Sequence, residues 1–137
     1  MANVLDVQVL HEGPRNIVVK LTGVLDTSDA SELPAVNMQS FTGNEPCCTL
    51  AGLRVDLIEY SIGSGIEIQL AWAGNSPQQI TPIAGRGRIV ATNYGGFVPD
   101  QTRSGYNGDI NLTTTGYQAG TVQNFSVILE LIKLYKV

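Results

Sequence analysis

The chain has few charged residues. Asp, Glu, Lys and Arg make up 15% of the 137 residues, against roughly 25% in an average soluble domain. Because scattered charge keeps copies of a free monomer apart, this deficit favours a protein that buries surface against neighbouring protein copies. A monomer kept soluble by Thr, Asn and Gln is the alternative. The eight basic residues are dispersed and the net charge is −4, so we expect no nucleic-acid partner.

Long apolar runs are also missing. No stretch approaches the roughly 20 apolar residues that span a bilayer, and residues 1–10 have neither the basic nor the apolar region of a secretory signal. We therefore expect no membrane partner and synthesis in a cytoplasm. Cysteine occurs twice, as the adjacent Cys47 and Cys48. Their spacing suits neither an ordinary disulfide nor a zinc site, so we expect reduced, structural thiols; a redox pair is the alternative.

Histidine occurs once, as His11, so any triad-like catalytic arrangement would depend on this one residue. A solvated histidine in a turn is the simpler interpretation. Four acidic residues, Asp26, Asp29, Asp100 and Asp109, fall in predicted loops and leave calcium open as an alternative, but their spacing is not that of an EF-hand. Turn and capping roles explain Asp26 and Asp29 without a metal. The sequence predicts a protein that is not an enzyme, with no catalytic residues, no cofactor and no metal.

What the sequence does contain is a repeated alternation of apolar and polar residues. Short alternating runs are separated by Gly, Pro, Asn and Asp, a pattern typical of half-buried β-strands. The runs at residues 5–9 and 17–22 flank Gly13-Pro14 and predict a hairpin. The C-terminal run, residues 121–137, also fits helical spacing, but its β-branched content favours a long central strand.

The middle of the chain predicts a second hairpin. Residues 53–62 change the face that carries their apolar side chains, which either a bulge near Leu57 or burial on both faces would explain. Gly63-Ser64-Gly65 then predicts a tight turn into residues 66–72. Trp72 is in phase with the apolar face of that strand, so we expect it in the core.

Between these hairpins lies a long connection without a period, residues 23–48. Asp26-Thr27-Ser28-Asp29 predicts a turn or helix cap before a short helical turn at residues 30–33, which Pro34 would end. Connections of this length are uncommon in compact domains unless they make contacts, so this one is a candidate functional segment.

Further along the chain, residues 80–83 and 88–92 predict short edge strands beside prolines and glycines. Residues 94–107 predict a long, glycine-rich surface loop, and residues 110–115 predict a strand. The whole chain, residues 1–137, is therefore expected to form a single all-β domain: an antiparallel β-sandwich of about eight strands with one long early connection and a glycine-rich surface loop.

Five residues of these two irregular segments are candidates for a protein interface, because both segments are unusually apolar or long. They are Asp26, Phe41, Tyr94, Phe97 and Tyr106. Ordinary packing of loops over the ends of the sandwich is the alternative. Stacking of the loop aromatics on sugar rings, as in a β-sandwich lectin, is another.

Four segments resemble the capsid decoration, or cement, proteins of tailed bacteriophages. They are IVVKLTGVLDTSD at residues 17–29, LRVDLIEYSI at 53–62, GDINLTTTG at 108–116 and FSVILELIK at 125–133. The resemblance implies a jelly-roll-like sandwich, often trimeric, that lies on the capsid exterior and binds across neighbouring major capsid protein subunits. It implies a structural virion protein with no catalytic residues, made in the host cytoplasm. A carbohydrate-binding or receptor-binding β-sandwich module is the alternative function.

Overall fold

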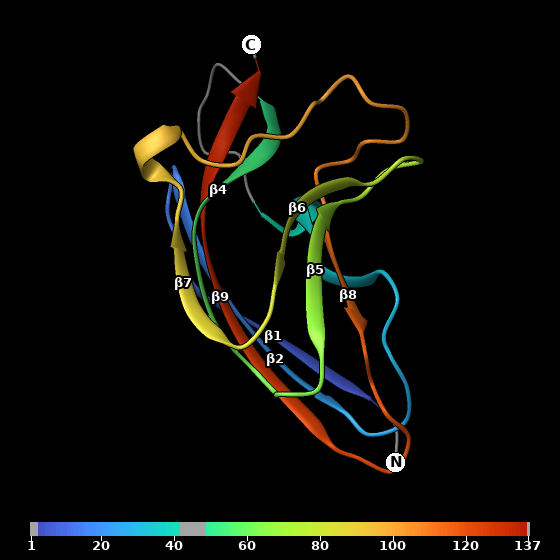
Figure 1. The fold of residues 1–137 in the computed structure, drawn as a ribbon. Helices are drawn as coiled ribbons and strands as arrows, with labels where there is room; N and C mark the ends of the chain where they lie inside the picture. Colours follow the sequence, from blue (N-terminus) through green and yellow to red (C-terminus); the bar gives the residue numbers. More distant parts are fainter. Residues whose placement is uncertain (1–2, 42–48, 137) are drawn as a thin grey trace.

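The computed structural model describes residues 3–41 and 49–136, which form two antiparallel β-sheets (Figure 1). The large sheet has five strands in the order β1-β2-β9-β4-β7, and the small sheet has four in the order β3-β8-β5-β6. The strands of the large sheet are β1 (Val4–Glu12), β2 (Asn16–Leu25), β9 (Gln123–Lys136), β4 (Thr49–Ile62) and β7 (Arg86–Val90). Those of the small sheet are β3 (Leu33–Val36), β8 (Ile110–Thr115), β5 (Glu67–Trp72) and β6 (Gln78–Ile83). The prediction of an all-β sandwich is confirmed.

The strand order is that of a jelly roll with one added edge strand. The neighbours β2-β9-β4-β7 and β3-β8-β5-β6 give two four-stranded sheets. From β2 to β9 the chain changes sheet at every step except between β5 and β6, as in two interleaved Greek keys. The ninth strand, β1, extends the large sheet beyond β2. Two 3₁₀ turns, η1 (Met38–Ser40) and η2 (Thr92–Tyr94), complete the regular structure of the described residues, in which no helix is long and apolar enough to cross a membrane.

The core lies between the inner faces of the two sheets. Alternate residues of each central strand are buried there, and their neighbours face outward. Each large aliphatic side chain removed from water contributes about 1.5–3 kcal/mol. Fully buried members include Ile17, Val19, Leu21, Leu53, Val55, Ile58, Ile68, Leu70, Ile110, Leu112, Val127 and Leu129. Trp72 is 4% exposed, as predicted.

Several predicted strands and irregularities are confirmed. The β1–β2 hairpin pairs Val4 with Val24 and Glu12 with Ile17. Both explanations offered for the change of face in β4 hold: a register shift lies between Val55 and Leu57, and the consecutive residues 55–58 are all buried. The short strands β6 and β7 are both sheet edges, and the C-terminal run is a central strand because β9 pairs with β2 on one side and with β4 on the other.

The predicted hairpin around Gly63-Ser64-Gly65 is wrong. This turn carries the chain from β4 in the large sheet to β5 in the small sheet, and the two strands do not pair. The reason is that β4 already has β9 and β7 on its two edges. The Gly63 N–H donates to the Asn124 carbonyl of β9 at 2.8 Å, which holds the turn on the large sheet while the chain crosses over.

The predicted helical turn at residues 30–33 is also wrong. The Asp29 carboxylate accepts hydrogen bonds from the Thr114 hydroxyl and the Tyr117 N–H, both at 3.1 Å, instead of capping a helix. Ala30 exchanges two further hydrogen bonds with Thr114. The chain therefore stays extended and enters β3, an edge strand that tolerates Pro34. Cys47 and Cys48 lie outside the described residues.

Two glycines of the large sheet lie under aromatic rings from the neighbouring strand. Gly23 of β2 pairs with Phe125 of β9, and a Cβ atom at Gly23 would overlap the Phe125 ring. At the sheet edge, a Cβ atom at Gly87 would lie 2.8 Å from the Tyr60 hydroxyl. In both pairs the ring fills the space that the missing side chain leaves, as cross-strand aromatics do elsewhere.

Candidate functional site

The sandwich has four sheet edges, and β1 is the longest of them. An edge strand presents unpaired N–H and C=O groups on its outer side, to which another strand binds readily. The other three edges are protected: β3 has four residues and contains Pro34, β6 contains Pro82, and β7 has five residues with an arginine at each of two positions. By contrast β1 has nine residues without proline and, in the described part of the chain, pairs with β2 alone.

The side chains of β1 are unusually apolar for an exposed strand. Val4 is 57% exposed, Val7 42%, and Val9 and Leu10 47% each. Val7 and Val9 lie on the inner face of the strand and Val4 on the outer face, and apolar side chains left exposed along a sheet edge mark an interaction site. The start of the strand is held in place, because the Asn3 side chain accepts from the N–H groups of Asp26 and Thr27 and donates to the Ser28 carbonyl.

An apolar groove of about 170 Å³ runs between β1 and the β3 edge of the small sheet. Val7 and Val9 form one side of this edge groove, and β3 with the residues after it forms the other. The residues that line it are Val7, Val9, Val19, Pro34, Ala35, Val36, Asn37, Ser40 and Phe41. None of them is titratable, so the edge groove suits an apolar side chain of a protein partner rather than acid–base chemistry.

The five predicted interface residues lie in separate places. Phe41 is 9% exposed and lines the edge groove. Asp26 follows β2, where Leu25 pairs with Gln123 at the start of β9.

The other three belong to the glycine-rich loop. Phe97 is half-buried and bridges to Val55. Tyr106 is half-buried, and its hydroxyl donates to the Ala51 carbonyl at 3.1 Å. Since β4 near Ala51 pairs with the end of β9, the loop residues and Asp26 lie at opposite ends of the large sheet. Tyr94 belongs to η2, and the role of all five in an interface stays a prediction.

The glycine-rich loop is fastened to the sandwich at several points. The Gln78 side chain exchanges two hydrogen bonds with the Asp100 backbone, at 2.9 and 2.7 Å. The Asn75 side chain donates to the Ser104 hydroxyl at 2.8 Å. Phe97 and Val55 exchange both backbone hydrogen bonds. The loop is therefore an ordered cover over one end of the sandwich.

Charged groups near this loop are paired or capped. The Arg54 and Asp56 side chains form two hydrogen bonds, at 2.7 and 3.1 Å, and the hydrogen bond to Asp56 raises the pKa of Arg54. The Asp100 carboxylate accepts from the Thr102 hydroxyl and N–H, which lowers its pKa. Asp109 accepts from the Met38 N–H at 2.9 Å. In residues 3–41 and 49–136, no three His, Cys, Asp or Glu side chains gather as metal ligands.

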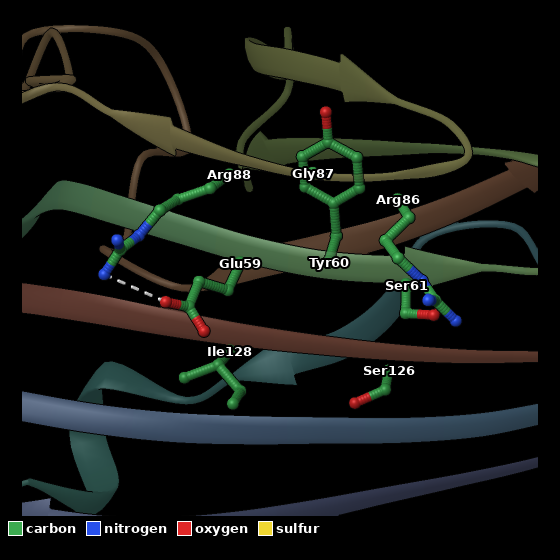
Figure 2. A pocket seen from close by; sticks show the side chains of 8 residues that line it. All are labelled: Glu59, Tyr60, Ser61, Arg86, Gly87, Arg88, Ser126 and Ile128. Atoms are coloured by element: carbon green, nitrogen blue, oxygen red, sulfur yellow. Dashed lines mark ion pairs between the residues drawn. The ribbon is translucent and has the colours of Figure 1, made fainter.

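The outer face of the large sheet is polar and slightly hollowed. Figure 2 shows Glu59 and Ser61 of β4 beside Ile128 and Ser126 of β9, with arginines reaching across from β7. Arg88 forms an ion pair with Glu59 at 3.0 Å. Both side chains are largely exposed, so the pair contributes little to stability. The hollow offers hydrogen-bond donors and acceptors, and no arrangement of a nucleophile with a base.

Sequence reasoning missed the edge groove. The alternation of Leu5, Val7 and Val9 predicts a buried face, whereas β1 extends past the cover that the small sheet provides. The exposure of β1 depends on the number of strands in the facing sheet, for which the sequence of β1 carries no signal. Comparisons of the chain with protein-family models, with curated proteins and with solved structures found no match.

Proposed function

We propose that the protein is a structural virion component that decorates the exterior of a tailed-phage capsid and binds across neighbouring major capsid protein subunits. The observation that carries this proposal is the ordered glycine-rich loop, which exposes Val98, on a jelly roll with few charges. Such a surface binds protein through apolar burial. Its role is mechanical, because contacts across subunit boundaries resist outward pressure on the shell.

The proposal assigns the capsid contact to the glycine-rich loop. This loop is apolar and held rigid by the contacts to Gln78 and Val55. A preordered loop loses little conformational entropy on binding, which raises affinity. Val98, at 57% exposure, is an apolar side chain of this loop that lies open to a partner. The resemblance to decoration proteins implies three copies acting together, so that several weak contacts combine through effective concentration.

The test is attachment to purified tailed-phage capsids that lack the protein. We expect saturation at a fixed copy number and a higher temperature of capsid disruption. Val98→Asp should weaken attachment at least about tenfold, because it places a charge in an apolar contact. Val122→Asp, at a valine that is 63% exposed outside the loop, is the matched control and should attach normally. Absence of attachment by the wild-type protein would contradict the proposed function; equal attachment by both variants would contradict the loop assignment.

A carbohydrate-binding module is the second candidate, and one observation favours it. Hydroxyl and amide side chains of Thr22, Ser61, Ser126 and Asn124 line a hollow of about 560 Å³ beside Arg86 on the outer face of the large sheet. Saturable binding on a glycan array, lost in Arg86→Ala, would support this function. Trp72 takes no part in this candidate site, because its indole N–H donates to the Leu53 carbonyl within the core at 3.3 Å.

A further inference from the structure

The polarity of β1 is palindromic. From residue 4 to residue 10 the sequence is VLDVQVL, and its order of apolar and polar residues is the same in both directions about Val7. From Val4 to Val9 the odd-numbered residues face inward with their partners on β2, and the even-numbered ones face outward. In an antiparallel pair, residues directly opposite each other lie on the same face of the sheet. A palindromic edge strand is therefore complementary to a second copy of itself.

We propose that two copies of the protein pair through β1, antiparallel and about a two-fold axis at Val7. The two five-stranded sheets then continue into one another across the axis. A two-fold interface uses the same surface patch on both copies, which is the commonest symmetry among soluble oligomers. The inference does not rest on the proposed capsid role, because the pairing needs no third component, and it puts two copies in place of the three that the resemblance implies.

On the inner face this register joins apolar side chains. Val7 lies opposite Val7 of the second copy, and Leu5 lies opposite Val9 of the second copy. Val7 and Val9 are 42% and 47% exposed in the single chain and line the edge groove. Pairing therefore brings the edge grooves of the two copies together and covers the exposed valines of both.

At the end of this register Val4, on the outer face and 57% exposed, meets the segment of the second copy around Leu10, which is 47% exposed and lies at the register shift between Val9 and His11. On the outer face the register also pairs Asp6 with Gln8 of the second copy, so no two like charges lie opposite each other. The bulge between Val9 and His11 ends the regular segment at Val9 and limits the pairing to the residues before it.

Neighbouring registers fit less well. An axis at Asp6 places this carboxylate opposite Asp6 of the second copy, and like charges directly opposite each other are destabilising. An axis at Gln8 extends the pairing of Leu5 and Asp6 past Val9 into the register shift of the second copy. An axis at Leu5 places Val4 opposite Asp6 and Val7 opposite Asn3, so that apolar side chains meet polar ones. The register about Val7 is the one that matches apolar with apolar and polar with polar throughout.

The test uses Gln8, whose neighbour within the chain is Lys20 of β2. Gln8→Glu places a carboxylate beside Lys20, and this attraction favours the folded single chain. In the dimer, the two-fold axis creates two equivalent pairs in which the new carboxylate lies opposite Asp6 of the other copy, so repulsion occurs twice. We expect light scattering of the wild-type protein to give about twice the 14.6 kDa chain mass. In Gln8→Glu the dimer should dissociate about tenfold more readily. Adding Asp6→Lys to Gln8→Glu restores opposite charges across the axis and should restore the dimer.

Gln118→Glu is the matched control, since it adds the same charge at an exposed glutamine outside β1 and should leave the mass unchanged. A wild-type monomer or trimer would overturn the inference, as would a dimer that Gln8→Glu leaves intact or that Asp6→Lys fails to restore. Because capsids are absent from this experiment, its result is independent of the attachment test: a dimer that ignores capsids contradicts the capsid role and leaves the pairing standing.

Discussion

The Tyr106 hydroxyl is the point at which the glycine-rich loop meets β4. The hydroxyl donates to the Ala51 carbonyl at 3.1 Å. The neighbouring Gly52 has no side chain and so leaves space for the hydroxyl, since a Cβ atom at Gly52 would lie 2.6 Å from it. The burial of the Tyr106 phenol and the nearby Asp109 carboxylate raise its pKa above the usual value of about 10. The neutral phenol is therefore part of the folded state.

This raised pKa predicts a specific loss of stability in alkali. A group whose pKa is higher in the folded state contributes stability below its unfolded pKa, and the contribution is lost as the pH rises past about 10. Tyr106→Phe should cost about 1 kcal/mol at pH 7 because it removes the hydrogen bond. It should also make the free energy of unfolding fall less steeply above about pH 10 than in the wild-type protein, as measured by urea denaturation across pH. Parallel curves for the two proteins would contradict the role of the buried phenol.

The sequence predicted the burial and the partners of single residues less well than it predicted the positions of strands. It placed Trp72 in the core correctly because its phase with Ile68 and Leu70 follows from period-2 geometry. It gave no sign that Lys133 is buried, since that lysine lies on the inner face of β9 and its ammonium reaches the Glu12 carboxylate at 3.0 Å. A pairing across 121 residues has no local signature.

At the level of structural elements, strands β2 and β9 pack closely at the Gly23–Phe125 pair, where the Phe125 ring lies over Gly23. We predict that Gly23→Ala costs about 1–3 kcal/mol, because the new methyl group enters the space of the Phe125 ring. Combined with Phe125→Ala, the cost should be less than the sum of the two single changes by about 1 kcal/mol or more. Urea denaturation of the four proteins of this cycle gives the coupling.

The control is the same cycle with Phe97, which bridges to Val55 in the middle of β4, whereas Phe125 pairs with Ile62 at the end of that strand. Gly23→Ala and Phe97→Ala should add within about 0.5 kcal/mol. Additivity of Gly23→Ala with Phe125→Ala as well would mean that the ring moves aside without cost, against the prediction.

The sequence predicted which segments form strands better than it predicted which strands pair with each other. The bulge in β4 and the edge positions of β6 and β7 were predicted because parity shifts, prolines and glycines are local signals. The hairpin at Gly63-Ser64-Gly65 was wrong because turn residues report that the chain reverses, and not whether the next strand joins the same sheet. The same limit applies to the candidate site: the apolar pattern of β1 was visible, but its exposure depends on how far the facing sheet extends.

For the whole molecule, pairing through β1 would leave the three protected edges free. We predict that amide hydrogen exchange in β1 slows as protein concentration rises, because the outer N–H groups of the strand find partners in the dimer. Exchange in β3, β6 and β7 should not depend on concentration. Gln8→Glu should abolish the concentration dependence in β1, whereas equal slowing at all four edges would indicate unspecific association.

The central place of β9 has a consequence for the route by which the chain folds. β2 and β4 flank β9, so Asn16 finds its partner, Ile132, only when the last strand is available. Contacts this distant in sequence slow folding. Until β9 has been synthesised, β2 and β4 present open edges to other chains in the cell, and the large sheet closes in a single late step.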